Sequence, residues 1–175
     1  MRVVITGGPG TGKTSIIECL NKMNFNVFNE SSREVTKKYK NIDSEQYFLS
    51  NPLDFSNILM DKRKKQFEKG SKSKNEYFFY DRGMPDVLAY LNFKKIDYQS
   101  SMISEILKFN YDAIFLAEPW KAIYKNDSER YESYSELLEI DVHIKKIYKQ
   151  LGYKTIFLPK KSVKDRVNFI LETLH

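Results

Sequence analysis

The segment VVITGGPGTGKTS, residues 3–15, places four glycines and a proline between an apolar stretch and a helical pattern. Glycine and proline both disfavour a continued strand or helix, so the chain is expected to turn here. Residues 7–14 fit the spacing G-x-x-x-x-G-K-[ST], in which successive backbone N–H groups face inward and form a nest for phosphate oxygens. The sequence therefore predicts a strand, a phosphate-binding loop and a helix in direct succession.

Individual side chains of this loop are expected to bind different parts of a nucleotide and its metal ion. We expect Lys13 to reach the β- and γ-phosphates of a nucleotide and the Thr14 hydroxyl to ligate Mg²⁺. No guanine-reading motif of the form N/T-K-x-D occurs at a predicted strand end, which favours ATP over GTP. The predicted nucleotide-binding residues are Gly8, Gly10, Thr11, Gly12, Lys13, Thr14 and Ser15.

Short apolar runs recur along the chain and alternate with helical patterns. We predict strands at 2–6, 26–28, 77–80, 113–116 and 155–158, and helices after the glycine loop and at about 54–69, 137–151 and 163–174. Continuous apolar strands are typical of a parallel sheet that is covered on both faces. The 175 residues therefore predict one α/β domain, spanning 1–175, with three layers and five parallel strands.

Composition narrows the class of protein further. No apolar run approaches the roughly 20 residues of a membrane span, so we expect none. A single cysteine, Cys19, cannot form an internal disulfide, which favours a reducing, cytoplasmic setting. The net charge of +6 includes lysine-dense stretches at 61–74 and 145–149. Acidic and apolar residues interrupt both stretches, so solvated helix faces are favoured over nucleic-acid binding.

Charged side chains come directly after the second and third predicted strands. In open α/β sheets, ligands bind beyond the carboxyl ends of the strands, so these side chains are candidates for catalysis. Asp81 is expected to hold Mg²⁺ or to contact an acceptor, although it could instead cap a helix. Arg82 could neutralise charge on a moving phosphoryl group or form a surface ion pair. Glu30 could accept a proton from an attacking hydroxyl or stabilise a following helix dipole.

The segment 121–134 is the candidate lid. It is charged and aromatic, and it lies between the fourth strand and a strong helical pattern. In phosphoryl-transfer proteins such a segment can close over the site and deliver a cation to the phosphates. Arg130 and Lys125 are the candidates for that cation, and an ordinary solvated loop is the alternative.

Together these motifs resemble a known family. The ordered series ITGGPGTGKTS, NESSREV, FYDRGMPDVLAYL, NDSERY and LGYKTIFLP is similar to the small P-loop ATPase family that includes the kinase domain of the bacterial NAD regulator. That domain phosphorylates nicotinamide riboside. The series is more distantly similar to deoxynucleoside and thymidylate kinases. Because AAA-type sensor motifs and a second helical domain are not found, the resemblance does not imply a hexameric motor.

The resemblance adds expectations of its own. It implies a sheet in the order 2-3-1-4-5, an acceptor-side acid at Glu30, an acid–arginine pair at Asp81–Arg82 and a lid arginine at Arg130. The resulting hypothesis is a P-loop phosphotransferase that moves the γ-phosphate of ATP to a small hydroxyl-bearing acceptor, with a nucleoside or nucleotide favoured. The alternative is a regulatory NTPase that binds ATP or GTP as a switch. The acceptor's identity and the oligomeric state are left open.

Overall fold

The computed structural model describes residues 1–30, 35, 51–70, 77–124 and 132–174. The strands of this part of the chain are β1 (Arg2–Thr6), β2 (Asn26–Phe28), β3 (Phe78–Asp81), β4 (Ala113–Leu116) and β5 (Thr155–Phe157). Its helices are α1 (Lys13–Lys22), α4 (Pro52–Gly70), α5 (Pro85–Phe93), α6 (Ser100–Ile106), α7 (Tyr134–Gln150) and α8 (Val163–Leu174).

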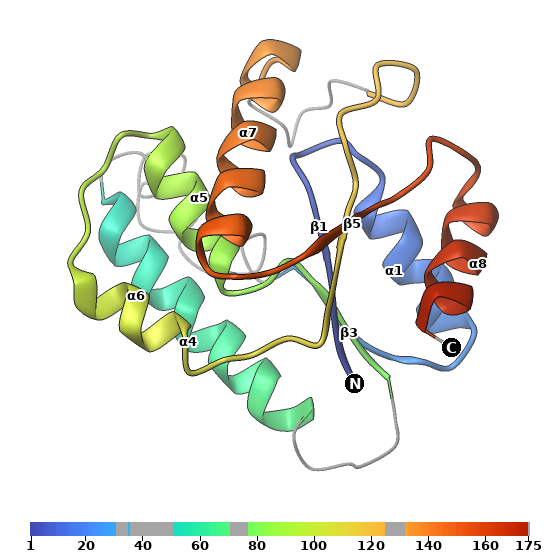
Figure 1. Ribbon diagram of the computed structural model, residues 1–175, viewed down its shortest axis with the longest axis horizontal. Coiled ribbons are helices and arrows are strands. Elements are labelled where there is room, and N and C mark those ends of the chain that lie inside the picture. The colour runs from blue at the N-terminus through green and yellow to red at the C-terminus, as the bar shows by residue number, and fades with distance from the viewer. Residues whose placement is uncertain (31–34, 36–50, 71–76, 125–131, 175) are drawn as a thin grey trace.

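The five strands form one parallel sheet in the order β2-β3-β1-β4-β5. The central strand β1 pairs Val4 with Tyr80 on one side and with Ile114 on the other. This arrangement confirms the predicted strand order and fold class. Because the strands are parallel, their carboxyl ends meet at one edge of the sheet, where the glycine-rich segment begins (Figure 1).

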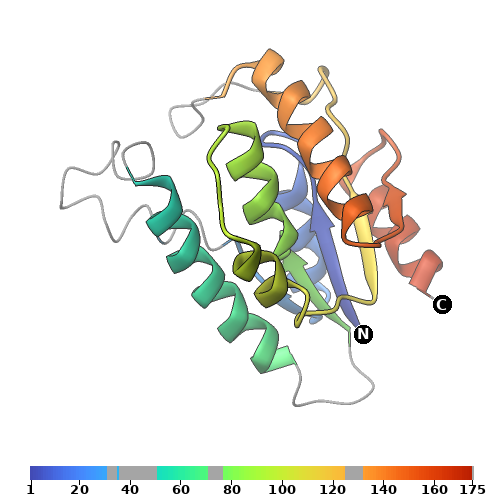
Figure 2. The same cartoon turned by 60° about the vertical axis from the view of Figure 1, so that its left-hand side comes forward.

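Helices cover both faces of the sheet, as Figures 1 and 2 show. Alternate residues of β1 point in opposite directions, so Val3 and Ile5 pack with α1 and α8 while Val4 packs with the helices of the other face. The core on the first face contains Ile16, Ile17, Leu20, Val167 and Ile170. The core on the second face contains residues of α4, α5 and α7, including Phe67, Leu88, Ile140, Ile144 and Tyr148.

Two helices are found that the sequence patterns did not predict. In α5, Pro85–Phe93, six of the nine residues are buried and none is fully exposed, because the helix packs against both α4 and α7. A helix buried on all sides lacks the apolar stripe that marks an amphipathic helix. The short α6 has only Ile106 buried, so it also lacks a readable stripe.

Several predicted boundaries move by one to three residues. Strand β3 is shifted by one residue and includes Asp81, while β5 ends at Phe157. Helix α8 begins at a capping contact, in which the backbone N–H of Asp165 donates to the Ser162 hydroxyl at 3.2 Å. Helix α7 begins earlier than predicted, at a capping box in which Ser133 and Glu136 exchange hydrogen bonds.

Candidate functional site

The glycine-rich segment, here the P-loop (residues 7–14), connects β1 to α1 as predicted. Three of its glycines have positive φ: 138° at Gly7, 73° at Gly10 and 85° at Gly12, the N-cap of α1. A side chain is also excluded at Gly7, because a Cβ there would lie 2.3 Å from the Ala117 carbonyl oxygen. The loop therefore needs glycine for its backbone path as well as for close approach of a ligand.

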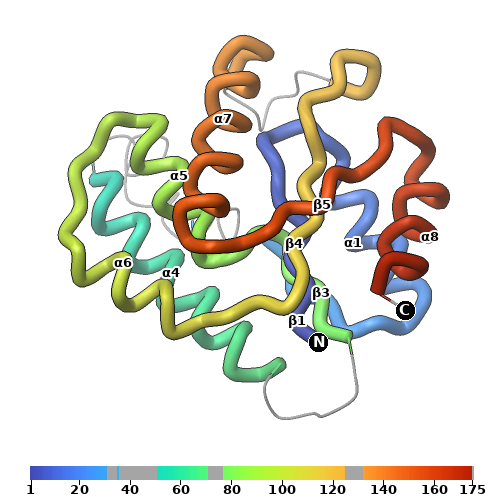
Figure 3. Tube along the Cα trace, viewed as in Figure 1, coloured from blue at the N-terminus to red at the C-terminus, as the bar shows by residue number. Residues whose placement is uncertain are grey.

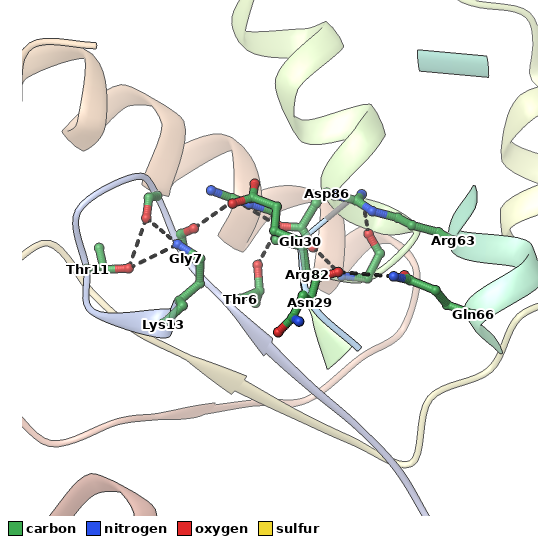
Figure 4. Close-up of polar contacts among 12 residues, drawn as sticks. Thr6, Gly7, Thr11, Lys13, Asn29, Glu30, Arg63, Gln66, Arg82 and Asp86 are labelled. Carbon is green, nitrogen blue, oxygen red and sulfur yellow. Dashed lines mark hydrogen bonds and ion pairs between the residues drawn. The ribbon is translucent and has the colours of Figure 1, made fainter. Parts of the chain in front are cut away.

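Lys13 lies at the centre of this loop and is almost completely buried. Its Nζ donates to the Gly8 carbonyl oxygen at 2.6 Å and lies 3.4 Å from the Thr11 hydroxyl (Figure 4). Burial, and then repulsion from Arg82, lowers the pKa of Lys13 to about 8. The lysine is thus held inside the loop by neutral oxygen atoms, which balance its charge only in part.

Arg82 joins two of the predicted site segments, the residues after β2 and the P-loop. Its Nε donates to Glu30 Oε1 at 2.7 Å, and its NH1 donates to the Gly7 carbonyl oxygen at 2.9 Å (Figure 4). The guanidinium carbon also lies 5.3 Å from the centre of the Tyr90 ring. Burial alone would lower the pKa of Arg82, but Tyr90, Glu30 and nearby Asp86 outweigh it and raise the pKa well above its ordinary value.

The backbone of Arg82 has φ 71°, an uncommon value for a residue with a side chain. The next turn is held by Asp86, which is 1% exposed. Asp86 accepts from the Gly83 N–H at 2.8 Å, the Tyr148 hydroxyl at 2.7 Å and the Thr6 hydroxyl, and it lies 3.6 Å from Arg82 NH1. These contacts come from β1, the β3–α5 turn and α7, so Asp86 fixes the place from which Arg82 extends.

Asp86 was not among the site residues predicted from the sequence. The available signal was a single carboxylate inside the otherwise apolar run MPDVLAYL, four residues after Arg82. A buried carboxylate in such a run needs hydrogen-bond partners, which is a reason to look for a network. Which partners it finds depends on how α5 packs against α7 and β1.

Asp81 ends β3 beside the P-loop and is 4% exposed. Its Oδ1 has no hydrogen-bond partner among the described residues. Burial, with a further contribution from Glu30, raises the pKa of Asp81 to about 6, although Lys13 and Arg82 oppose the change. A carboxylate with an unused buried oxygen at this place fits a site for a cation.

A cavity of about 220 Å³ opens beside Asp81. Thr14, Asp81 and Glu30 share its wall, which is completed by Glu18, Asn21 and Asn29. The structure thus brings the two predicted metal ligands, Thr14 and Asp81, to one cavity. Across the described part of the chain there is no cluster of three or more His, Cys, Asp or Glu side chains that could bind a metal. Mg²⁺ suits this sparse set, because it is commonly bound by one or two protein oxygens together with phosphates and water.

The other predicted residues differ in where they lie. Thr11 is buried and donates to the Gly8 carbonyl oxygen, whereas Thr14 and Ser15 are exposed at the start of α1. Arg130 and Lys125 lie outside the described residues, so their predicted role is not tested. The ends of the candidate lid are described: the Tyr124 hydroxyl donates to the Glu132 carbonyl oxygen at 2.7 Å. The chain leading to Tyr124 extends past the carboxyl edge of the sheet, on the same side as the P-loop (Figure 3).

Comparison with known proteins identifies the family of this chain. A family model described as an AAA domain matches residues 2–166. The chain belongs to this AAA-domain family. No curated protein gives a significant match. None of the described helices is both long enough and apolar enough to cross a membrane.

Solved structures share the fold of this AAA-domain protein at low sequence identity. Deoxyadenosine kinase from M. mycoides with bound dATP has a TM-score of 0.72 at 17% identity, with 99% of each chain covered. Thymidylate kinase from Ehrlichia chaffeensis has a TM-score of 0.69 at 13% identity, covering 100% of this chain and 98% of the other. NadR in complex with NR has a TM-score of 0.73 at 16% identity, covering 99% of this chain and 50% of NadR. The chain therefore has a P-loop fold of the nucleoside- and nucleotide-kinase type.

Proposed function

We propose that this protein transfers the γ-phosphate of ATP to a hydroxyl group of a small acceptor, with a nucleoside or nucleotide as the favoured acceptor class. The observation that carries the proposal is the contact of Arg82 with both Glu30 and the P-loop carbonyl of Gly7. It joins an acidic side chain at the end of β2 to the loop that is expected to hold the nucleotide. A site that only bound a nucleotide would not require an acidic side chain, such as Glu30, to be held beside the P-loop.

Glu30 is the proposed general base. Its side chain is 16% exposed at the edge of the cavity beside Asp81, so an acceptor hydroxyl can approach it while most bulk water is excluded. The ion pair with Arg82 holds the carboxylate at the wall of this cavity, where it can accept a proton from a bound hydroxyl. Glu30 would orient the hydroxyl and take its proton as the oxygen attacks the γ-phosphorus.

Lys13 and Arg82 are the proposed stabilisers of the transferring group. Phosphoryl transfer depends mainly on positioning and on balancing charge on the phosphate oxygens. Lys13 is buried inside the loop with a depressed pKa, so an approaching phosphate offers it a stronger partner than the Gly8 carbonyl. Arg82 already lies against the loop and needs little reorganisation to face the same group.

Thr14 and Asp81 would hold Mg²⁺, which in such sites neutralises charge on the β- and γ-phosphates. The unpartnered, buried Oδ1 of Asp81 and the shared cavity support this assignment. The relatives agree with the reaction class: two of the structures with this fold are named as kinases, and one holds dATP. NadR, which holds NR in a related structure, supports a nucleoside-like acceptor.

The decisive experiment incubates the protein with Mg²⁺, ATP labelled on the γ-phosphate and a panel of nucleosides and nucleoside monophosphates. We expect label to move to one class of acceptor and expect the transfer to be lost in Glu30→Gln. The exposed α7 variant Glu139→Gln is the control for loss of one carboxylate. Slow release of free phosphate with no labelled acceptor would contradict the kinase and support the regulatory NTPase.

A further inference from the structure

Helix α8 contributes a buried cation to the outer side of the P-loop. Arg166 lies in the first turns of α8 and is 4% exposed. Its NH1 donates to the Thr11 carbonyl oxygen at 3.0 Å, across 155 residues of sequence. A guanidinium is therefore in direct contact with the loop, although no motif in the sequence connects α8 with it.

Gly12 makes this close approach possible. A Cβ at Gly12 would lie 2.8 Å from Arg166 NH1 and 3.3 Å from Ile123 Cδ1. The guanidinium thus packs on the backbone at the residue that precedes Lys13 and caps α1. This is the end of the helix where a phosphate group is expected to bind.

Among the described residues, no charged group balances the charge of Arg166. In the part of the chain that the structure describes, no carboxylate forms an ion pair with Arg166, and its buried Nε has no hydrogen-bond partner. Burial lowers the pKa of Arg166, and none of the described charged groups is found to oppose that change. The N-terminal position on α8 also places a cation at the less favourable end of that helix.

Removing an unpaired charge from water is costly, so such groups are normally paired, hydrogen-bonded or matched by a bound ligand. The Thr11 carbonyl supplies one neutral acceptor, and a guanidinium can donate five hydrogen bonds. Arginine is well suited to phosphate, because its planar donors match the phosphate oxygens. A polyphosphate at the P-loop would supply the missing negative charge.

We propose that Arg166 belongs to the nucleotide site, where the phosphates of the bound nucleotide neutralise its charge. The inference rests on the proposed function only in that it requires a nucleotide at the P-loop. It does not depend on whether a phosphoryl group is then transferred. Arg166 is a positioning residue for the nucleotide, acting with the loop from a helix at the opposite end of the sequence.

The test compares Arg166→Gln with Arg166→Lys by isothermal titration calorimetry, using Mg²⁺ with ATP and ADP, and adenosine without phosphates. The glutamine keeps an N–H donor for the Thr11 carbonyl but removes the charge, whereas the lysine keeps the charge. We expect Arg166→Gln to weaken ATP binding by about tenfold or more. Arg166→Lys should retain most of the affinity, and adenosine binding should change by less than about twofold.

A structural role would give a different result. If Arg166 only braced the loop, Arg166→Gln would lower the melting temperature of the nucleotide-free protein and leave the ATP affinity unchanged, which would overturn the proposal. The charge-matched control is Lys164→Met, an exposed change on the same helix, for which we expect an unchanged ATP affinity. A fall in affinity equal to that of Arg166→Gln would also overturn it, because net charge alone would then explain the effect.

One further variant separates this inference from the proposed function. Lys13→Ala should weaken ATP binding if the P-loop holds the nucleotide at all. Loss in Lys13→Ala with no loss in Arg166→Gln would reject only the role of Arg166. No change in either variant would reject the nucleotide site itself, and with it the proposed function.

Discussion

Arg82 and Lys13 are both buried cations beside the P-loop, but their charges are balanced to different degrees. Arg82 is paired with Glu30, lies near Asp86 and donates to the Gly7 carbonyl, and its pKa is raised. Lys13 is held by the neutral oxygens of Gly8 and Thr11, and its pKa is lowered to about 8. The region around Arg82 is thus electrostatically complete without a ligand, and the loop around Lys13 is not.

The difference indicates what each region is built for. A complete network holds its members in one geometry, which suits a group that must be in place before the reaction. A network whose charges and hydrogen bonds are not all matched leaves groups that a ligand can pair with. Lys13 and the unpartnered oxygen of Asp81 are such groups among the described residues. We expect substitutions in the incomplete region to affect binding and transfer, and substitutions in the complete region to affect stability as well.

The largest effect is expected at Lys13, the centre of the incomplete region. Lys13→Ala should reduce phosphoryl transfer by about 1,000-fold or more, because the variant loses the buried cation of the loop that is proposed to balance charge on the phosphates. Its unfolding free energy should change little, because a poorly balanced charge is removed. Steady-state transfer assays and thermal melts measure the two quantities. Full turnover in this variant would show that the loop does not hold the reacting phosphates.

A substitution of Glu30 tests the link between the Arg82 network and the P-loop. Glu30→Gln should lower kcat by about 100-fold or more, because the amide cannot accept the acceptor's proton. The affinity for ATP should stay within about twofold, since the proposed role of Glu30 is to contact the acceptor and not the nucleotide. Single-turnover kinetics together with calorimetry separate the two effects. An unchanged kcat would remove Glu30 from the mechanism and leave it as a partner of Arg82.

Asp86 tests the complete region directly. Asp86→Asn should lower kcat by about tenfold and the unfolding free energy by about 1–3 kcal/mol, because an amide cannot accept all the hydrogen bonds that Asp86 now receives. The KM for ATP should change little, as expected for displacement of Arg82. Asp97→Asn, an exposed change between α5 and α6, is the matched control. A loss of stability with normal kcat would show that Arg82 keeps its position without Asp86.

The smallest effect concerns Asp81 in protein freed of metal and nucleotide. The pKa of Asp81 is raised to about 6, so between about pH 4 and 6 the folded state binds more protons than the unfolded state. Stability should therefore fall as pH rises through this window. Asp81→Asn should lack the fall and be more stable than the wild type at pH 7 by on the order of 1 kcal/mol. Chemical denaturation at several pH values in EDTA measures the unfolding free energy of both proteins. If the two free energies changed with pH in parallel, the raised pKa of Asp81 would be contradicted.

Much of the site was accessible from the sequence because its signals are local. The P-loop spacing, the strand before it and the helix after it lie within about twenty residues. Glu30 and Asp81–Arg82 could be predicted because they stand directly after apolar runs, and parallel strands bring their carboxyl ends to one edge. Asp86 was missed because its importance comes from three hydrogen-bond donors on β1, the β3–α5 turn and α7.

By itself, the sequence determined the alternation of strands and helices, the glycine-rich turn between β1 and α1, and the acidic and basic residues at the strand ends. These features depend on hydrophobic periodicity and on the backbone freedom of glycine, which act over short distances along the chain. Only the tertiary structure decided that Arg82 joins Glu30 to Gly7, that Asp86 holds Arg82, and that Arg166 reaches Thr11 from α8. The reason is that a buried charge must find partners in space, and packing of distant elements determines which partners are within reach.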